Sequence, residues 1–520
     1  MRSWSVRTVF CLLGLGGLGL PRAMAAVKLP SLFSNNMVLQ ANAQDPVWGT
    51  ADPGEAIAVT VGDVHASTTT DRAGNWKLEI GPLPPGGPFT MTVAGKNTIE
   101  IQNVLVGQVW LCSGQSNMTF AVARHLDWTD TGTEHYKDEV AAANYPQIRM
   151  FTVAETVAGK PQRDVPGHWD ITSPVTVGDY SAVAYFFGLN LYKELHEPIG
   201  LIHSSWPGTP AESWTTLPTL ESNKEFADIL DRWRKMEAAY PAAMDRYNEA
   251  LQGWEKAADR AESAGSPIPR APHLPFDPRS YSWRPAGLYD AMIAPLIPFR
   301  IKGAIWYQGE SNGSRAVQYR TLFPDMIRDW RQAWGEGDFP FLFVQLASYQ
   351  SVLPPSNWPL LREAQLKALA VPDTAMVVTV DIGSVRRVHP RNKQEVGRRL
   401  SLAARALAYD QKVIYSGPIY SSKQVKGDKI ILHFTHLGGG LVARRYSGTP
   451  AGLAGFEIAG ADRSFVEARA EIEGDTVVVE SPLVSNPVAV RYAWQNYPIC
   501  NLYNEAGLPA SPFRTDDWPE

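Results

Sequence analysis

A serine-containing turn is the first segment of this chain whose residue types could carry out chemistry. Residues 113–118 (SGQSNM) directly follow a short apolar run that ends near Cys112. A serine on a tight loop between a strand and a helix exposes its hydroxyl, and helix N–H groups there can stabilise a developing oxyanion. Ser116 is therefore a candidate nucleophile, although serine and asparagine after glycine also form ordinary turns and helix caps.

A glycine-containing turn could supply a further donor to such an oxyanion. Residues 204–209 (SSWPGT) follow the apolar stretch 200–202, and Gly208 would let its backbone N–H approach a bound carbonyl. Trp206 is a candidate for substrate binding, because a flat apolar ring can cover the C–H face of a sugar. On its own, the segment is equally typical of a plain Pro-Gly turn.

Two later clusters contain an amide, a carboxylate and a histidine. Residues 303–312 (GAIWYQGESN) place Gln308 and Glu310 after an apolar run. An amide there can donate to an oxyanion, and a carboxylate can orient a histidine. His389 lies in the segment 388–392 (VHPRN), just before a predicted helix. A single histidine is more often structural than catalytic, but four such clusters in one chain indicate a nucleophilic active site.

The elements that must position these clusters alternate between buried strands and helices. Short apolar runs stand at 108–112, 200–202, 303–306, 341–346 and 376–381, and helical patterns separate them. This alternation predicts an α/β fold with a parallel sheet covered by helices on both faces. In such a sheet ligands bind beyond the carboxyl ends of the strands, and each of the four clusters falls at such an end.

Two β-rich segments flank the α/β region. We expect an N-terminal β-sandwich-like domain over residues 26–106 and a C-terminal β domain over 411–520, because short strands and turn clusters recur in both. The α/β domain would span 107–410, with a helical insertion at about 217–278 in which Pro241 marks a break or a second helix start. An apolar stripe at helical spacing in the insertion is more typical of packing surface than of a binding site.

The composition is that of a soluble globular protein, with 44% hydrophobic and 19% charged residues. Residues 1–25 are typical of a removable export signal, so we expect a periplasmic or secreted protein. No later segment has the length and apolar character of a membrane span. The formal net charge is −5, and removal of a signal with three Arg makes the mature surface more acidic, which disfavours nucleic acid as a partner.

Cysteine usage gives little indication of a metal site. Cys112 and Cys500 follow the signal, and an oxidising compartment would permit one disulfide between them. Cys112 ends an apolar run, which favours a buried thiol. Because no Cys/His cluster has the spacing of zinc ligands, we expect no metal and no organic cofactor.

The motifs together resemble those of a known enzyme family. Residues 110–118 (WLCSGQSNM), 306–312 (WYQGESN) and 389–400 (HPRNKQEVGRRL) are similar to the sialate O-acetylesterase family, which belongs to the SGNH hydrolases and is related to acetylxylan esterases. The resemblance runs over most of residues 27–520 and implies hydrolysis of acetyl esters on an acetylated oligo- or polysaccharide.

The resemblance also implies a role for each candidate residue. Ser116 would attack the acetyl carbonyl, and His389 would take the proton of the serine and return it to the sugar hydroxyl. The backbone N–H groups of Ser116 and Gly208 would form the oxyanion hole together with the side chain of Gln308. Asn117, beside the nucleophile, is a further candidate for substrate binding.

The chain departs from the family pattern next to the histidine. The family usually carries Asp-Ile-His-Pro, whereas Arg387-Val388 precede His389 here. Glu310 could orient the histidine instead, as the equivalent Glu is thought to do in acetylxylan esterases, or Asp381 could fold back to reach it. A third alternative is a Ser–His pair without an acid, or a protein that has lost activity.

Three arginines near the histidine allow two interpretations. Arg386, Arg387 and Arg391 could bind the carboxylate of an acidic sugar in a bidentate fork, or they could pair with surface acids. Two rival functions also stay open. One is a non-catalytic carbohydrate-binding protein on a decayed esterase fold. The other is a hydrolase of lipids or peptides, which the absence of a Gly-x-Ser-x-Gly elbow around Ser116 disfavours.

Overall fold

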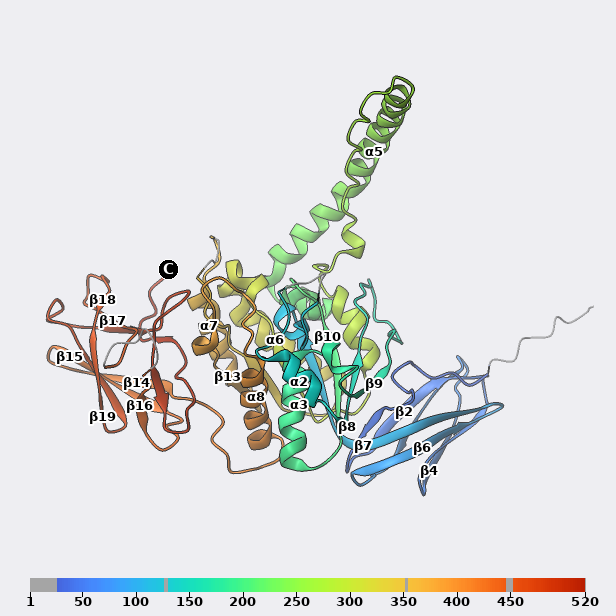
Figure 1. The fold of residues 1–520 in the computed structure, drawn as a ribbon, viewed down its shortest axis with the longest axis horizontal. Coiled ribbons are helices and arrows are strands. Elements are labelled where there is room, and N and C mark those ends of the chain that lie inside the picture. The colour runs from blue at the N-terminus through green and yellow to red at the C-terminus, as the bar shows by residue number, and fades with distance from the viewer. Residues whose placement is uncertain (1–25, 126–129, 351–353, 446–451, 520) are drawn as a thin grey trace, which may run out of the picture.

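The protein consists of three bodies that follow one another along its long axis (Figure 1). The computed structural model describes residues 26–125, 130–350, 354–445 and 452–519, and the predicted export signal lies outside them. An N-terminal β domain is followed by a central α/β domain and a C-terminal β domain, and one long helix projects from the centre. Among the helices in these ranges, none is long and apolar enough to cross a bilayer.

The central sheet has the predicted α/β architecture. Its strand order is β13-β12-β11-β7-β10-β8-β9, and neighbouring strands are parallel except at the β8–β9 edge. Every residue of β10, β11 and β12 is buried, as expected for strands covered on both faces. The strands are β7 (Thr98–Gly114), β8 (Tyr145–Thr152), β9 (Trp169–Thr172), β10 (Ile199–Ser205), β11 (Gly303–Tyr307), β12 (Phe341–Val344) and β13 (Thr374–Val377).

Helices cover both faces of this sheet. On one face α3 and α8 pack together, and Trp110 of β7 meets Phe187 of α3 edge-on with ring centroids 5.0 Å apart. On the other face Trp306 of β11 meets Trp330 of α6 at 5.6 Å. The helices of the central domain, apart from the projecting α5, are α1 (Ser116–Thr119), α2 (Tyr136–Ala142), α3 (Ala182–Leu195), α4 (Leu217–Ser222), α6 (Ala316–Trp334), α7 (Trp358–Lys367) and α8 (Lys393–Leu407).

One continuous strand joins the N-terminal domain to the central sheet. β7 is 17 residues long; its first half pairs with β6 and β1, and its second half pairs with β10 and β11. The boundary predicted at residue 106 falls inside this strand, just after the position, Val104, from which every residue is buried. The other strands of this domain are β1 (Val38–Gln40), β2 (Asp45–Thr50), β3 (Ala56–Val61), β4 (Val64–Thr69), β5 (Asn75–Ile80) and β6 (Gly86–Ala94).

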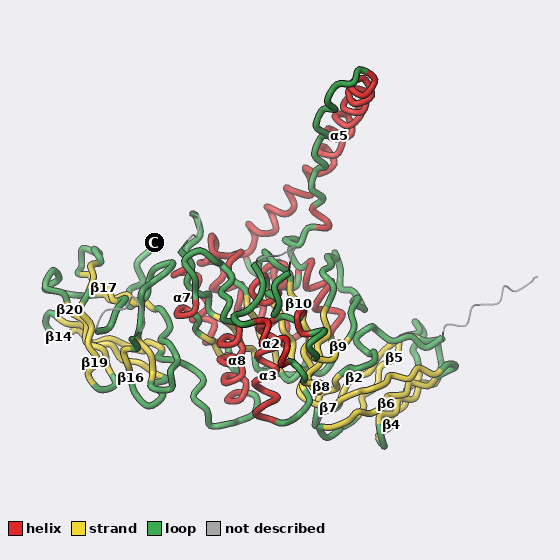
Figure 2. The backbone as a smooth tube through the Cα atoms, viewed as in Figure 1, coloured by secondary structure: helices red, strands yellow, loops and turns green. Residues whose placement is uncertain are grey.

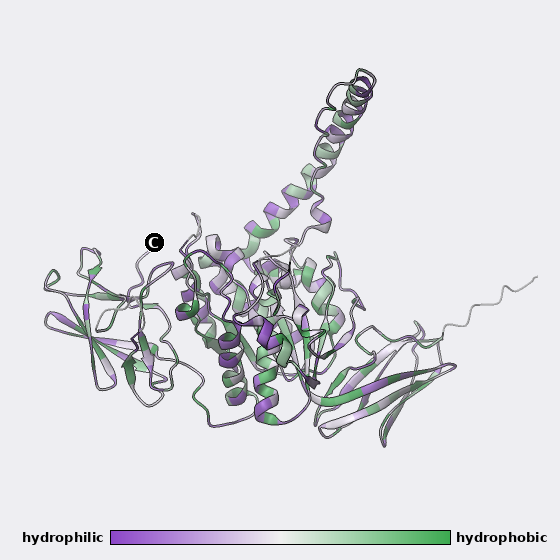
Figure 3. Cartoon of the chain, in the orientation of Figure 1, coloured by the Kyte–Doolittle hydropathy of each residue, from purple (hydrophilic) through white to green (hydrophobic). Residues whose placement is uncertain are grey.

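The helical insertion is a projecting arm. α5 (Ala227–Ser263) is a single 37-residue helix that continues through Pro241. The connector after it returns along the helix (Figure 2), and Trp254 Nε1 donates to the Pro269 carbonyl at 2.7 Å. Trp254, one residue of the predicted stripe, therefore contacts the connector. Polar and apolar residues alternate along the arm (Figure 3), in contrast to the buried strands of the central sheet.

The C-terminal domain is built from antiparallel sheets, as predicted for an accessory β domain. Two four-stranded sheets, β14-β15-β20-β19 and β18-β17-β21-β23, are accompanied by the pair β16-β22. Cys500 lies in this domain and Cys112 in β7; both are buried, and no disulfide joins them. The strands are β14 (Ile419–Lys426), β15 (Lys429–Thr435), β16 (Leu441–Ala443), β17 (Phe456–Ala459), β18 (Val466–Glu467), β19 (Arg469–Glu473), β20 (Thr476–Glu480), β21 (Ala489–Tyr492), β22 (Leu502–Asn504) and β23 (Phe513–Arg514).

Candidate active site

The predicted nucleophile stands at the carboxyl end of the central strand. Ser116 is the first residue of α1, two residues after β7 ends at Gly114. Gly114 has φ +143°, and a Cβ there would lie 2.2 Å from the Tyr307 carbonyl oxygen, so only glycine lets β7 and β11 approach this closely. The turn is fixed further by Gln115, whose backbone N–H donates to the same carbonyl at 3.0 Å.

The turn after β10 lies beside the turn from Gly114 to Ser116, which we call the nucleophile turn. The Trp206 N–H donates to the Gly114 carbonyl at 3.2 Å, which fixes this loop against the end of β7. Gly208 has φ +73°, and a Cβ added to it would meet nothing within 4 Å. The side of Gly208 on which a Cβ would stand is therefore open. Trp206 is half-buried and packs against the core.

The histidine loop is tied directly to the residue after Ser116. Asn117 Nδ2 donates to the carbonyl of Val388 at 3.1 Å, and the rings of Phe120 and His389 lie 6.3 Å apart. His389 therefore lies in the same region as α1. The structure brings together Ser116, Asn117, Gly208 and His389, which the sequence separates by up to 273 positions.

The acid that contacts His389 is one that the sequence did not indicate. His389 Nδ1 lies 2.8 Å from Asp130 Oδ2, in the loop between α1 and α2. The other oxygen, Oδ1, accepts from Arg387 at 2.9 Å. Arg387 occupies the position where the resemblance leads one to expect an aspartate, and in this protein it binds an aspartate supplied from elsewhere.

The loop that carries Asp130 is held on both sides. On the α1 side, the Thr131 hydroxyl accepts from the His125 N–H at 2.9 Å, and the Thr133 N–H donates to the Val122 carbonyl at 3.0 Å. On the α8 side, Gln394 Nε2 donates to the Glu134 carbonyl at 2.7 Å. Hydrogen bonds to the segment after α1 and to the start of α8 thus hold the loop so that Asp130 contacts His389.

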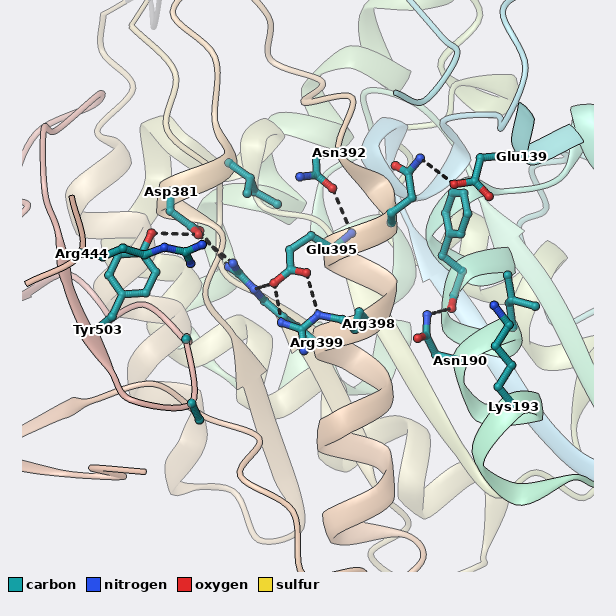
Figure 4. A pocket seen from close by; sticks show the side chains of 16 residues that line it. Glu139, Asn190, Lys193, Asp381, Asn392, Glu395, Arg398, Arg399, Arg444 and Tyr503 are labelled. Atoms are coloured by element: carbon teal, nitrogen blue, oxygen red, sulfur yellow. Dashed lines mark hydrogen bonds and ion pairs between the residues drawn. The ribbon is translucent and has the colours of Figure 1, made fainter. Parts of the chain in front are cut away.

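Glu310, which the sequence predicts to orient His389, contacts a different residue. Glu310 Oε1 accepts from Asn117 Nδ2 at 2.6 Å, while Asp130 supplies a carboxylate at the histidine. Asp381, the alternative acid, also has other partners. Asp381 binds Arg399 at 2.7 and 2.8 Å and Tyr503 at 3.1 Å, in the cleft between α8, α3 and the C-terminal domain (Figure 4).

A buried network lies behind the nucleophile turn. Lys393 is fully buried at the start of α8, and its ammonium donates to Asn117 Oδ1. It also lies 4.9 Å from the ring centroid of Phe120 and 5.1 Å from that of Tyr307. Asn117 therefore bridges Lys393 and Glu310, and joins α1, the turn after β11 and the histidine loop.

Burial shifts the pKa values of the titratable groups in this region. It lowers the pKa of Lys393 to about 7, against the opposing charges of Glu310 and Asp130. It raises the pKa of Glu310, against the hydrogen bond from Asn117. Burial also lowers the pKa of His389; the hydrogen bond to Asp130 opposes this shift, and the charge of Lys393 adds to it. A histidine with a lowered pKa is neutral, and able to accept a proton, over a wider range of pH.

Gln308, which the sequence predicts to donate to an oxyanion, donates to protein oxygens in this structure. Its side chain is fully buried, and its Nε2 donates to the Thr209 carbonyl at 3.2 Å and to Asn312 Oδ1 at 2.7 Å. Both amide hydrogens are thus directed at protein oxygens. Gln308 supports the turn that carries Gly208, because the Thr209 carbonyl belongs to that turn. Spacing from an apolar run cannot distinguish an amide that faces substrate from one that faces a neighbouring loop.

The three arginines have different surroundings. Arg387 forms an ion pair with Asp130, which agrees with the expectation that these arginines pair with acids. Arg386 is exposed, and Arg391 is half-buried with its carbonyl accepting from the Glu134 N–H at 3.3 Å.

Known proteins are similar to nearly the whole chain. The profile of the family described as "Carbohydrate esterase, sialic acid-specific acetylesterase" matches residues 279–406. The mouse protein named sialate O-acetylesterase is 30% identical over 537 residues, which cover 94% of both chains. The chain belongs to the sialate O-acetylesterase family. The human protein of the same name is 29% identical over 538 residues, covering 94% of this chain and 92% of that protein.

A solved structure supports this family assignment. The crystal structure of XAC1771, described as a novel carbohydrate acetylesterase from Xanthomonas citri, superposes with a TM-score of 0.78 and is 37% identical, covering 95% of this chain and all of that one. As a member of the sialate O-acetylesterase family, the protein is an esterase hydrolase with an SGNH-like fold and accessory β domains.

Proposed function

We propose that this protein removes acetyl groups from carbohydrates, with Ser116, His389 and Asp130 as its catalytic triad. The observation that carries this proposal is the 2.8 Å contact between His389 Nδ1 and Asp130, on a loop hydrogen-bonded to the residue after Ser116. A carboxylate at Nδ1 fixes the tautomer and leaves Nε2 as the nitrogen that exchanges a proton with serine. Asp130 takes the place of the Glu310 and Asp381 considered from sequence.

Acylation begins with attack of Ser116 Oγ on the acetyl carbonyl carbon while His389 Nε2 takes the serine proton. The carbonyl oxygen becomes an oxyanion, to which the backbone N–H groups of Ser116 and Gly208 donate. Collapse of the tetrahedral intermediate breaks the bond to the sugar oxygen, which receives the proton from His389 and leaves as a hydroxyl. Water then attacks the acetyl carbon of the acetyl-serine while His389 Nε2 takes a proton from the water. Collapse of the second tetrahedral intermediate breaks the bond to Ser116 Oγ, which receives that proton from His389, and acetate is released.

The sugar is proposed only as a class. Relatives are named for sialate esters and, in XAC1771, for carbohydrate acetyl esters in general. By analogy with these relatives, we propose that the substrate is an acetylated sugar of the sialic acid or hemicellulose type. Arg386, exposed near the histidine loop, is the arginine that could bind the carboxylate of an acidic sugar, since Arg387 is engaged by Asp130. The export signal expected at residues 1–25 supports a periplasmic or secreted location.

The missing aspartate before the histidine would favour the rival function, a carbohydrate-binding protein without activity. Because His389 has a carboxylate partner in Asp130, the missing aspartate no longer argues for that function.

Acetate release by the mature chain tests the proposal. The substrates are acetylated sialic acid, acetylated xylan and a small aryl acetate, and each is compared with Ser116→Ala. We expect release that disappears in the variant, and the preferred sugar then identifies the substrate class. A folded wild-type chain that releases no acetate from any of them would favour the binding protein.

A further inference from the structure

Three aromatic side chains line the segment that returns from the arm to the central domain. Phe276 and Tyr281 meet edge-on with ring centroids 4.2 Å apart, and Tyr281 and Trp283 lie nearly parallel, 13° apart, at 5.9 Å. Phe276 is 51% exposed and Trp283 37% exposed, and Tyr281 between them is half-buried. We call Phe276, Tyr281 and Trp283 the aromatic ledge.

The aromatic ledge is attached to the candidate active site. Trp283 Nε1 donates to the Gly208 carbonyl at 2.7 Å, so one end of the ledge touches the turn proposed to hold the oxyanion. The arm that carries the other end rises from the central domain, from the chain that follows β10 (Figure 1). The ledge thus leads from the site of ester cleavage toward the arm.

Polar contacts hold the segment that carries the aromatic ledge. Asp277 accepts from the Arg279 N–H at 2.9 Å and forms a bidentate pair with its guanidinium, and that guanidinium lies 5.5 Å from the ring centroid of Tyr240 on α5. These contacts fix the segment against the arm. Exposed aromatic rings in a fixed segment with polar neighbours are typical of a ligand surface, whereas scattered exposed rings need no explanation.

We propose that the aromatic ledge binds the sugar units of a polysaccharide that adjoin the acetylated one. This inference rests on the proposed function. The apolar C–H face of a pyranose stacks on a flat ring, while its hydroxyls stay in contact with water. A free monosaccharide ester would occupy the acetyl site alone, so the ledge favours a polymeric substrate.

Hydrolysis of two substrates tests this inference. The variants Phe276→Ala and Tyr281→Ala are compared with Ile268→Ala, a side chain 57% exposed on the same connector but outside the ledge. The readout is kcat/KM on acetylated xylan divided by kcat/KM on an aryl acetate. We expect this ratio to fall at least about fivefold in each ledge variant and to stay constant in the control, since loss of one aromatic contact is worth about 1 kcal/mol. An unchanged ratio, or an equal loss on both substrates, would overturn the proposal.

Binding separates failure of the ledge from failure of the proposed function. Ser116→Ala is titrated with deacetylated xylo-oligosaccharide by calorimetry, with and without Phe276→Ala, so that no hydrolysis is needed. Weaker binding in the double variant supports the ledge even if acetate release fails. Equal binding, or no binding by either protein, would contradict it.

Discussion

Two carboxylates beside the nucleophile turn, Asp130 and Glu310, are held in contrasting ways. Glu310 follows a strand of the central sheet, is enclosed by protein and contacts Asn117. Asp130 lies on a loop, its side chain is 34% exposed, and it contacts His389 and Arg387. The carboxylate fixed by the sheet supports the turn that presents Ser116, and the carboxylate on the loop contacts the base.

Under the proposed mechanism, position in the sheet does not decide which acid acts on His389. A buried carboxylate with a raised pKa stabilises an imidazolium poorly, because burial disfavours its own charged form. A partly solvated carboxylate avoids that penalty. The predictions below test whether the two acids have these separate roles, beginning with the largest effect.

Removing the charge of Asp130 should have the largest effect on turnover. Asp130→Asn keeps the shape but favours the wrong histidine tautomer, and we expect kcat to fall about 10³–10⁴-fold on an aryl acetate. Glu310→Gln keeps an acceptor for Asn117, and should lose less than about tenfold, the worth of one hydrogen bond. Similar losses in both variants would remove the distinction between the two acids.

Removing the buried ammonium should mainly affect stability. Lys393→Met leaves Glu310 buried without its nearby cation, and we expect a loss of about 3 kcal/mol, read as a lower urea-unfolding midpoint. Lys367→Met is the control, because its side chain is 52% exposed and its ion pair should contribute little. A midpoint equal to that of the control would show that the network does not support the fold.

The pH dependence of kcat/KM should reveal the charges around His389. The base must be neutral to act, and its pKa is lowered by burial, so the acid limb of wild type should lie below the usual histidine value of about 6.5. Lys393 lowers this pKa, so Lys393→Met should move the limb to higher pH. Asp130 raises it, so the residual activity of Asp130→Asn should have its limb at lower pH. Shifts in the same direction for both variants would contradict the assigned charges.

Removing the ion pair between Arg387 and Asp130 Oδ1 should have the smallest effect on turnover. Arg387 is 44% exposed, so its pair with Asp130 is worth at most about 1 kcal/mol, and Arg387→Ala should lower kcat by no more than about fivefold. The control is Arg72→Ala, an exposed arginine of the N-terminal domain. A loss as large as that of Asp130→Asn would mean that Arg387 itself acts on the substrate.

Much of the proposed site can be predicted from sequence because its motifs are local. The turns after β7 and β10 and the loop before α8 each combine an apolar strand or a helix start with adjacent polar residues, so Ser116, Gly208 and His389 were assigned without coordinates. Asp130 could not be found in this way, because it is 259 positions from His389 and its loop has no motif. Arg387 stands where an acid is expected, and it is the one local indication that the carboxylate beside His389 comes from another segment.

The sequence predicts the α/β architecture, but it does not indicate details that packing between distant segments decides. The strand β7 crosses the predicted domain boundary because its first half pairs with β6 and β1 and its second half with β10 and β11, and the sequence indicates only the apolar run 108–112. Gln308 has the residue type of an oxyanion donor but faces Thr209 and Asn312, and only the path of those loops determines its direction.

Chemical rescue tests the central claim, that Asp130 is the acid of the triad, most directly. Acetate release from an acetylated sugar is measured for Asp130→Ala and for Glu310→Ala, each with and without added formate. Because the Asp130 side chain is partly exposed, formate can enter the space left by its removal, whereas Glu310 is enclosed. We predict that Asp130→Ala loses about 10³-fold or more in kcat and regains part of it with formate, while Glu310→Ala gains nothing. Turnover by Asp130→Ala equal to that of the wild type would contradict the account.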